Sequence, residues 1–243
     1  MNKITYLSHA GFAVTLDEVI LVFDYVHDPA HSLKRIIDEN PDKPVIFFIS
    51  HKLVNNNHFN PGTFEIAQNR RRVFVVSNSL PAMYIPDTLE VQGMNHGDVI
   101  ENLPGNISVK AYDTTDKDKY KGVCFVVTTS DGKKIFHGGH FNDWDMPDET
   151  SKKDAHNSEM RFTEIVNRIA EENPSFDIVM MCVDPRISLD FAAGARIFTS
   201  KIKVQDFFPM DVDGDIHEAC QFQTYLPAGT TGHCMKPGES VIL

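Results

Sequence analysis

The chain has 243 residues, with 34 acidic against 23 basic residues and a formal net charge of -11 at pH 7. An acidic chain of this kind lacks the basic surface that neutralises phosphates, which argues against nucleic-acid binding and against an anionic membrane surface. The length suits one large domain that buries roughly 70% of its unfolded surface. We therefore predict a single domain over residues 1–243, with a division into two domains less favoured.

The sequence shows no signal for membrane insertion or export. No apolar run approaches the roughly 18 residues of a membrane span, and the first residues, MNKITYLSHAGF, lack the apolar core of a signal peptide. A soluble, cytoplasmic protein is predicted. The four cysteines are far apart and form no CxxC pair, so no disulfide is implied. Cys124 and Cys182 lie in apolar, strand-like runs and are predicted to be buried thiols.

The first part of the chain predicts a hairpin, a helix and a buried strand. Residues 4–25 run apolar in two pieces with an acidic turn between them, which is typical of a β-hairpin. Residues 33–39 have helical spacing, with Ser32 placed to cap the first turn. Residues 45–49, VIFFI, form a continuous apolar run after a proline and predict a strand buried on both faces.

Further strands and helices follow in the rest of the chain. A helix is predicted over residues 61–68, where Pro61 suits the first turn, and others over 160–172 and 191–202 from their apolar spacing. Strands are predicted over 73–77, 89–91, 99–100, 107–112, 123–129, 134–136, 177–182 and 205–210. Residues 229–238 are compatible with part of a C-terminal β-hairpin near the rim, but the sequence does not place this segment. This order fits an α+β, four-layer αββα sandwich better than a doubly wound sheet.

The loop after the buried strand carries a family resemblance. From His51 to Pro61 the chain reads HKLVNNNHFNP. It resembles the metal-binding loop of the metallo-β-lactamase superfamily, which reads His-x-His-x-Asp-His and in many members continues Phe-Asn-Pro. Here Leu53 or Asn55, depending on the anchor, stands where the family has its second histidine, and Asn57 stands where it has a metal-binding aspartate. An asparagine amide can neither accept a proton nor balance a dication.

Other segments extend the resemblance to most of the chain. YLSHAGFAV and LVFDY are similar to the opening strands of the L-ascorbate-6-phosphate lactonase-like branch, where His9 either faces the site or hydrogen-bonds within the sheet. IFHGGH ends in His140 where the family has an aspartate, and FPMD ends in Asp211 where the family has a histidine. TTD at residues 114–116 is similar to a further strand end, where Asp116 is either a ligand or a turn-capping residue.

The resemblance implies the metallo-β-lactamase fold, in which strand-end loops of two packed sheets hold one or two metal ions. The implied metal ligands here are His51, His58, His140 and Asp211, three nitrogens and one carboxylate that suit at most one ion, zinc or another divalent metal. The protein is then a metal-dependent hydrolase-like enzyme acting on an ester, lactone or phosphodiester, with His58, His140 and Asp211 as catalytic residues.

Neighbouring residues receive supporting roles in this interpretation. His137 contacts the metal ligands without binding the ion, and Asp184 and Arg186 hold the rim of the site together by hydrogen bonds. The expected partner is a small-molecule substrate or ligand, and a homo-oligomer stays open.

The missing ligands support a second interpretation. Metal affinity that rests on coordination number falls steeply when ligands are lost. The alternative is therefore a metal-free, non-catalytic pseudoenzyme that keeps the sandwich and serves as a binding or scaffolding protein.

Overall fold

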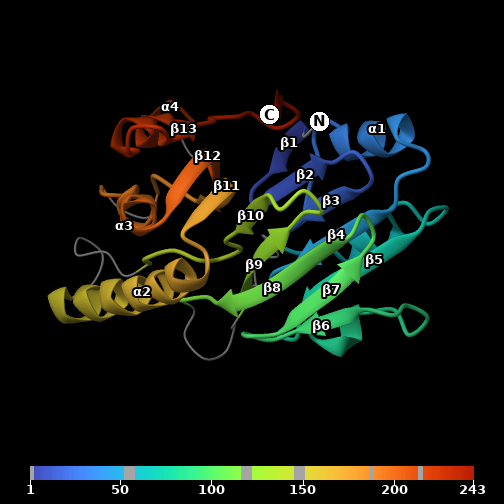
Figure 1. The fold of residues 1–243 in the computed structure, drawn as a ribbon, viewed down its shortest axis with the longest axis horizontal. Coiled ribbons are helices and arrows are strands. Elements are labelled where there is room, and N and C mark those ends of the chain that lie inside the picture. The colour runs from blue at the N-terminus through green and yellow to red at the C-terminus, as the bar shows by residue number, and fades with distance from the viewer. Residues whose placement is uncertain (1–2, 52–57, 116–121, 145–150, 187–188, 213–215) are drawn as a thin grey trace.

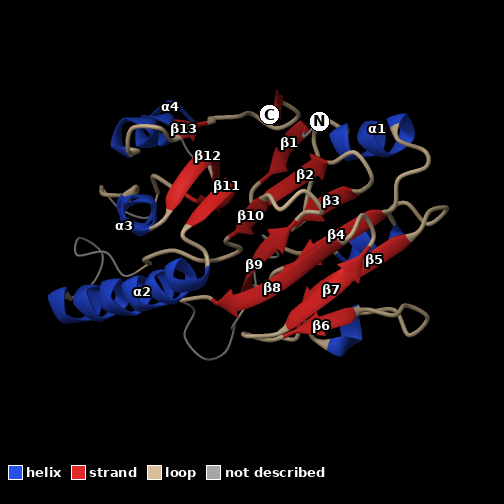
Figure 2. Cartoon of the chain, in the orientation of Figure 1, coloured by secondary structure: helices blue, strands red, loops and turns tan. Residues whose placement is uncertain are grey.

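Two mixed β-sheets packed face to face form the centre of the molecule (Figures 1 and 2). The computed structural model describes residues 3–51, 58–115, 122–144, 151–186, 189–212 and 216–243. Within these residues each sheet has seven strands, the first in the order β14-β1-β2-β3-β4-β5-β6 and the second in the order β13-β12-β11-β10-β9-β8-β7. No helix in this part of the chain is long and apolar enough to cross a membrane.

Each sheet combines an antiparallel part with a parallel part. The first sheet contains β1 (Lys3–Ser8), β2 (Gly11–Thr15), β3 (Ile20–Phe23), β4 (Val45–Ile49), β5 (Arg72–Ser77), β6 (Gln92–Met94) and β14 (Ser240–Ile242). The second contains β7 (Val99–Leu103), β8 (Ile107–Asp113), β9 (Val123–Thr128), β10 (Lys134–His137), β11 (Ser175–Cys182), β12 (Lys203–Met210) and β13 (Thr231–Gly232). Strands β3 to β6 are parallel to one another, as are β10 to β13.

Helices cover the outer face of both sheets and complete four layers. They are α1 (Ser32–Glu39), α2 (Lys152–Glu172), α3 (Ala193–Lys201) and α4 (Ile216–Cys220), with the short 3-10 helices η1 (Pro61–Glu65), η2 (Ala82–Tyr84) and η3 (Gln221–Tyr225). Leu33 and Ile36 of α1 pack on the outer face of the first sheet. Phe162 of α2 and Phe198 of α3 pack on the outer face of the second. The predicted α+β, four-layer αββα sandwich is confirmed.

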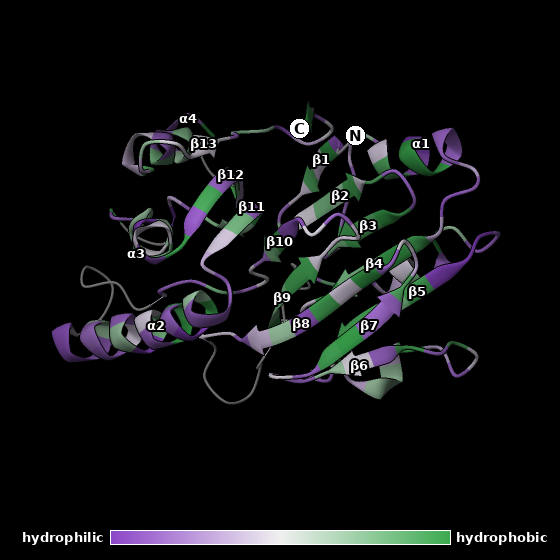
Figure 3. Cartoon of the chain, viewed as in Figure 1, coloured by the Kyte–Doolittle hydropathy of each residue, from purple (hydrophilic) through white to green (hydrophobic). Residues whose placement is uncertain are grey.

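Strand β4 shows why its sequence is apolar throughout. Successive side chains of a strand point to opposite faces, so Phe48 lies in the core between the sheets and Phe47 lies in the core under α1. All five residues of β4 are buried. Figure 3 shows apolar residues concentrated in these central strands, whereas hydrophilic residues prevail along α2. The predicted strand over residues 45–49, buried on both faces, is confirmed.

Several local predictions differ from the structure. The expected N-terminal hairpin is three strands, because His9 adopts φ 49° in a turn that divides the first apolar piece. Ser32 does not cap α1: His31 holds the N-cap position, and Asp28 Oδ2 accepts from the Leu33 N–H at 2.8 Å instead. The helix predicted over 61–68 is the shorter η1, and the strand predicted over 89–91 is β6 at Gln92–Met94. Helix α2 begins at Lys152, eight residues before the predicted start. The prediction missed its first turns because they are polar and lack the apolar spacing of residues 160–172.

The C-terminal segment also departs from the prediction. Residues 229–238, which the sequence did not place, form no hairpin, because β13 pairs with β12 of the second sheet whereas β14 pairs with β1 of the first. A disulfide joins Cys220 at the end of α4 to Cys234, which corrects the expectation of none. The spacing of the cysteines carries no signal for this bond, because the pairing depends on how the C-terminal segment packs against α4. Cys124 and Cys182 are buried thiols outside any disulfide, as predicted.

Candidate metal centre

Three strand ends bring polar side chains to one edge of the sandwich. Asp24 directly follows β3, Ser50 and His51 follow β4, and His140 lies just after β10. Because β3 and β4 are adjacent and parallel, their carboxyl ends meet at the same edge, where α/β proteins commonly bind ligands. His58 joins them from the segment before η1.

Asp24 is the centre of this polar cluster, and its side chain is fully buried. Its Oδ1 accepts from the Ser50 backbone N–H at 2.7 Å, and its Oδ2 accepts from the Ser50 hydroxyl at 2.5 Å. The same Oδ2 lies 2.9 Å from Nδ1 of His58. The backbone of Asp24 is in the left-handed region, with φ 39°, which aspartate adopts more readily than most residues. Three donors therefore fix the carboxylate.

The hydrogen bonds of Asp24 determine the tautomers of two histidines. The Ser50 hydroxyl has one hydrogen and gives it to Asp24, so its oxygen accepts from Nδ1 of His51, 2.9 Å away. His58 likewise donates its Nδ1 hydrogen to the carboxylate. Both neutral rings then carry the proton on Nδ1 and keep a lone pair on Nε2. In metal-binding histidines one ring nitrogen binds the ion, and the N–H of the other usually donates to a group that fixes the ring, as Nδ1 does here.

The rings of His51, His58 and His140 form one cluster. Ring centroids are 4.0 Å apart for His51 and His58, 5.2 Å for His51 and His140, and 5.7 Å for His58 and His140. Asp24, His51 and His58 each offer a ligand atom within 4.8 Å of the others. Nε2 of His51 is buried and has no hydrogen-bond partner among the described residues. Since an unpaired buried acceptor is costly, this donor set fits a metal ion.

Burial keeps His51 and His58 neutral. Loss of solvation, followed by the charges of neighbouring histidines, lowers the pKa of His51 and of His58 well below 6.5. Burial also raises the pKa of Asp24 to about 6. The contact between Asp24 and His58 is therefore a hydrogen bond from a neutral imidazole to a carboxylate, although the distance alone would allow an ion pair. Neutral imidazole is the form that binds metals.

Two glycines allow the strand ends to approach so closely. Gly139 has φ 55°, and a Cβ atom on it would lie 2.7 Å from the side chain of Ser50. A Cβ on Gly122 would lie 2.5 Å from the Cβ of His51. Any larger residue at either position would push β4 and the neighbouring strands of the second sheet apart. The glycines thus position the histidine cluster.

His137 and His9 occupy different places relative to this cluster. Nε2 of His137 lies 2.9 Å from the Ala10 carbonyl and must donate to it, while Nδ1 accepts from the Gly139 N–H at 3.3 Å. With both nitrogens used, His137 holds the strand ends in place. His9 lies close enough to His58 to contribute to the lowering of its pKa.

The remaining predicted residues lie along the ends of β11 and β12. The Asp211 N–H donates to the His9 carbonyl at 3.0 Å, and the Asp211 carboxylate interacts with the buried Cys182 thiol, whose pKa is raised chiefly by burial and also by this charge. Arg186 donates to Asp184 through Nε at 2.9 Å and through a terminal nitrogen at 2.6 Å. Asp116 and loop residues Leu53, Asn55 and Asn57 lie outside the described residues.

Two residues of the site were assigned no role from the sequence. Asp24 had one signal, its place directly after an apolar strand in LVFDY. Trp144, the single tryptophan of the chain, stacks on the ring of His140 with centroids 4.1 Å apart and planes at 18°. Its indole N–H also donates to the His140 carbonyl at 3.0 Å. Trp144 therefore restrains the third histidine of the cluster.

Comparison with solved structures identifies the class of fold. No protein-family model and no curated protein sequence matches the chain. Igni18, a metallo hydrolase from Ignicoccus hospitalis KIN4/I, matches with a TM-score of 0.69 at 17% identity, over 99% of this chain and 97% of that one. The metallo-β-lactamase fold protein YhfI from Bacillus subtilis matches with a TM-score of 0.64 at 9% identity, over all of both chains. The chain has the metallo-β-lactamase fold.

The fold also occurs in a protein of different chemistry. CmlA, a diiron β-hydroxylase from Streptomyces venezuelae, matches with a TM-score of 0.65 at 13% identity, over 100% of this chain and 54% of that one. Since identities this low show the fold alone, the activity of this chain has to be inferred from its own site.

Proposed function

We propose that the protein is a metal-dependent hydrolase with a single divalent ion, zinc or another, held by Nε2 of His51 and His58 together with His140. The observation that supports it best is the fixed tautomer of two neutral histidines, whose lone pairs belong to one buried cluster. Three imidazoles and no thiolate suit zinc, iron and other first-row divalent metals. Asp211 is proposed as the carboxylate that completes the ligand set.

A divalent ion in such a set supplies Lewis acidity, which makes water a nucleophile near neutral pH. The side chains around the ion would orient its histidine ligands. Asp24 holds the proton on Nδ1 of His58 and, through Ser50, the proton on Nδ1 of His51. Because Asp24 is already bonded to three donors, we assign it the role of orienting the ligands in preference to binding the ion directly. Trp144 restrains His140 at the more exposed side of the cluster.

The proposed substrate class is a small ester, lactone or phosphodiester. The net charge of -11 disfavours polyanionic substrates such as nucleic acids. His58, His140 and Asp211 are the residues proposed to act at the reacting bond. We infer this class from the resemblance in the sequence and from the ligand set, and the substrate is to be found by assay.

The first experiment measures metal content. Protein purified without chelator should carry about one equivalent of a divalent metal by inductively coupled plasma mass spectrometry, and His140→Ala should lose it. His156→Ala is the matched control, because His156 is exposed on α2. Metal absent from the wild type, with a melting temperature unchanged on adding metal, would favour the non-catalytic alternative.

A second readout uses Trp144 as a reporter. Because its ring stacks on His140, titrating zinc into chelator-treated protein should change the tryptophan emission in the wild type and in His156→Ala but not in His140→Ala. The loaded protein is then assayed with p-nitrophenyl acetate, a γ-lactone and bis-p-nitrophenyl phosphate. Hydrolysis of one of them that chelator abolishes supports the proposal. Equal rates for loaded and metal-free protein would refute it.

A further inference from the structure

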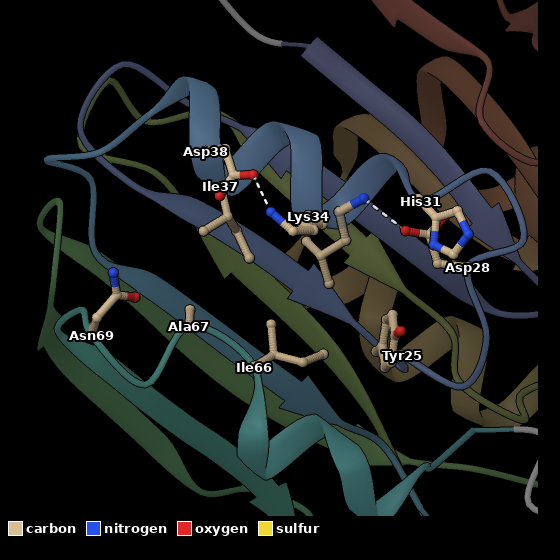
Figure 4. Close-up of a pocket in the computed structure, with 10 residues that line it drawn as sticks. Tyr25, Asp28, His31, Lys34, Ile37, Asp38, Ile66, Ala67 and Asn69 are labelled. Carbon is tan, nitrogen blue, oxygen red and sulfur yellow. Dashed lines mark hydrogen bonds and ion pairs between the residues drawn. The ribbon is translucent and has the colours of Figure 1, made fainter.

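A cavity of about 340 Å³ lies between α1 and the segment that follows η1. Figure 4 shows Lys34, Ile37 and Asp38 of α1 on one side, Ile66 and Ala67 on the other, and Tyr25 and Asp28 at one end. The volume lies within the usual range of small-molecule sites. None of the residues that line this cavity belongs to the proposed metal centre, so its ligand is a separate question from hydrolysis.

The cavity contains a buried carboxylate with half of its bonding capacity unused. Asp28 is only 9% exposed. Its Oδ2 accepts from the Leu33 N–H at 2.8 Å, and Oδ1 has no hydrogen-bond partner within the part of the chain that the structure describes. No ion pair to Asp28 is found among the described residues. A buried carboxylate oxygen of this kind requires a donor, and a charged donor satisfies it best.

The other charges around the cavity do not neutralise Asp28. The ammonium group of Lys34 is 2.5 Å from Asp38 Oδ2, one turn along the exposed face of α1. The charges of Lys34 and Asp38 neutralise each other, so the negative charge of Asp28 is not compensated by this pair. The exposed ring of His31 lies beside Asp28 at the mouth of the cavity (Figure 4). Because Oδ1 of Asp28 is itself buried, a ligand reaches it only after a neighbouring side chain moves, and His31 is the exposed side chain beside it.

The walls beside Asp28 are apolar and aromatic. Leu33 and Ile37 of α1 are buried, and Ile66 faces them from the opposite side. Tyr25 closes one end. Burial and the nearby charge of Asp28 both raise the pKa of the Tyr25 phenol, so the ring stays neutral and its face attracts cations. The lining therefore combines one anionic anchor with an apolar and aromatic surface.

We propose that this cavity binds a small organic cation, an ammonium group joined to an apolar or aromatic body. The ammonium group donates to Oδ1 of Asp28 and lies near the ring of Tyr25, while the body packs between Ile37 and Ile66. The charge selects against neutral and anionic molecules of the same shape, because only a cation balances the buried carboxylate.

The test compares three probes of one shape by isothermal titration calorimetry: phenethylamine, 2-phenylethanol and 3-phenylpropanoate. Phenethylamine should bind saturably, and the alcohol and the carboxylate should bind at least tenfold more weakly. Asp28→Asn should weaken phenethylamine at least tenfold while keeping an oxygen that can accept from the Leu33 N–H. Asp42→Asn, an exposed site outside the cavity, is the matched control and should bind as the wild type does.

A second variant guards against a folding defect in Asp28→Asn. Ile66→Trp fills the cavity from its half-buried side and should abolish binding with the carboxylate intact. Binding of all three probes with similar affinity, unchanged binding in Asp28→Asn, or no saturable phenethylamine binding to the wild type would overturn the proposal. None of these measurements depends on a metal, so the proposed hydrolase can fail while the cation site stands.

Discussion

Replacing Asp24 with asparagine separates the stability of the strand ends from their ability to bind metal. The carboxylate accepts from the Ser50 N–H at Oδ1 and from the Ser50 hydroxyl and His58 at Oδ2. An amide has only one acceptor oxygen. In Asp24→Asn the NH₂ group therefore replaces one carboxylate oxygen and lies against groups that are themselves donors. The Ser50 N–H is fixed in the backbone, so the NH₂ group takes the place of Oδ2.

The histidine tautomers then reverse. His58 must accept at Nδ1 and move its proton to Nε2. The Ser50 hydroxyl, which no longer donates to residue 24, turns toward Nδ1 of His51 and drives the same change there. Both Nε2 lone pairs are lost, and loss of such supporting partners typically costs 10- to 100-fold in metal affinity.

The effect of Asp24→Asn on folding should be much smaller. Burial raises the Asp24 pKa from 3.8 to about 6, so keeping the carboxylate ionised at pH 8 costs about 3 kcal/mol, a cost that the amide avoids. The amide also places a donor where Oδ2 was, and a buried polar group left unsatisfied beside Ser50 or His58 would cost roughly 1–3 kcal/mol. The two effects oppose each other, so the free energy of unfolding should stay within about 2 kcal/mol of the wild-type value.

Two measurements check this prediction. Long-range ¹H–¹⁵N correlation spectra of the metal-free protein should show Nδ1-protonated rings for His51 and His58 in the wild type and Nε2-protonated rings in Asp24→Asn. Zinc titration with a competing chelator gives the affinity ratio, and urea unfolding gives the stability, with Asp42→Asn as the control. Unchanged tautomers, or a zinc affinity within threefold of the wild type, would refute the reasoning about Asp24.

Two further predictions concern the metal-free protein. Because the folded pKa values of His51 and His58 lie below their unfolded value of about 6.5, their contribution to stability is present above pH 6.5 and is lost as the pH falls. Between pH 7.5 and 6.0 His51 and His58 should lower the free energy of unfolding by about 1 kcal/mol, net of the opposing effect of Asp24, and His137, whose pKa burial also lowers, should add to this loss. A rise would contradict the lowered pKa values. Phe48→Ala, in the core between the sheets, should cost about 3–5 kcal/mol by urea unfolding. Val99→Ala, at a 54% exposed position, should cost less than about 1 kcal/mol, and similar losses for both would argue against the packing described for β4.

Local patterns in the sequence predicted which elements form and which of their faces are buried. The run of residues 45–49 is apolar at every position because both faces of β4 are covered. The apolar spacing of residues 160–172 marks the buried face of α2, with Phe162 and Ile165 against the second sheet. Hydrophobic periodicity indicates which faces of a segment are buried. It therefore predicts where helices and strands form and whether one or both faces of a strand are covered.

The sequence also indicated part of the site. His51, His58 and His140 were expected to meet because each follows a strand or precedes a helix at a position that the family resemblance marks, and their rings do form one cluster. The role of Asp24 could not be read in the same way. Its importance comes from contacts with Ser50 and His58, which are distant along the chain.

Long-range packing decided the remaining features. The disulfide of Cys220, the pairing of β13 and β14 with different sheets, and the cavity beside Asp28 all arise where segments far apart in sequence meet. The sequence by itself determined which residues must be covered, because hydrophobic burial follows local spacing. Only the tertiary structure decided which polar groups are left facing one another, because that depends on where the backbone places each strand end.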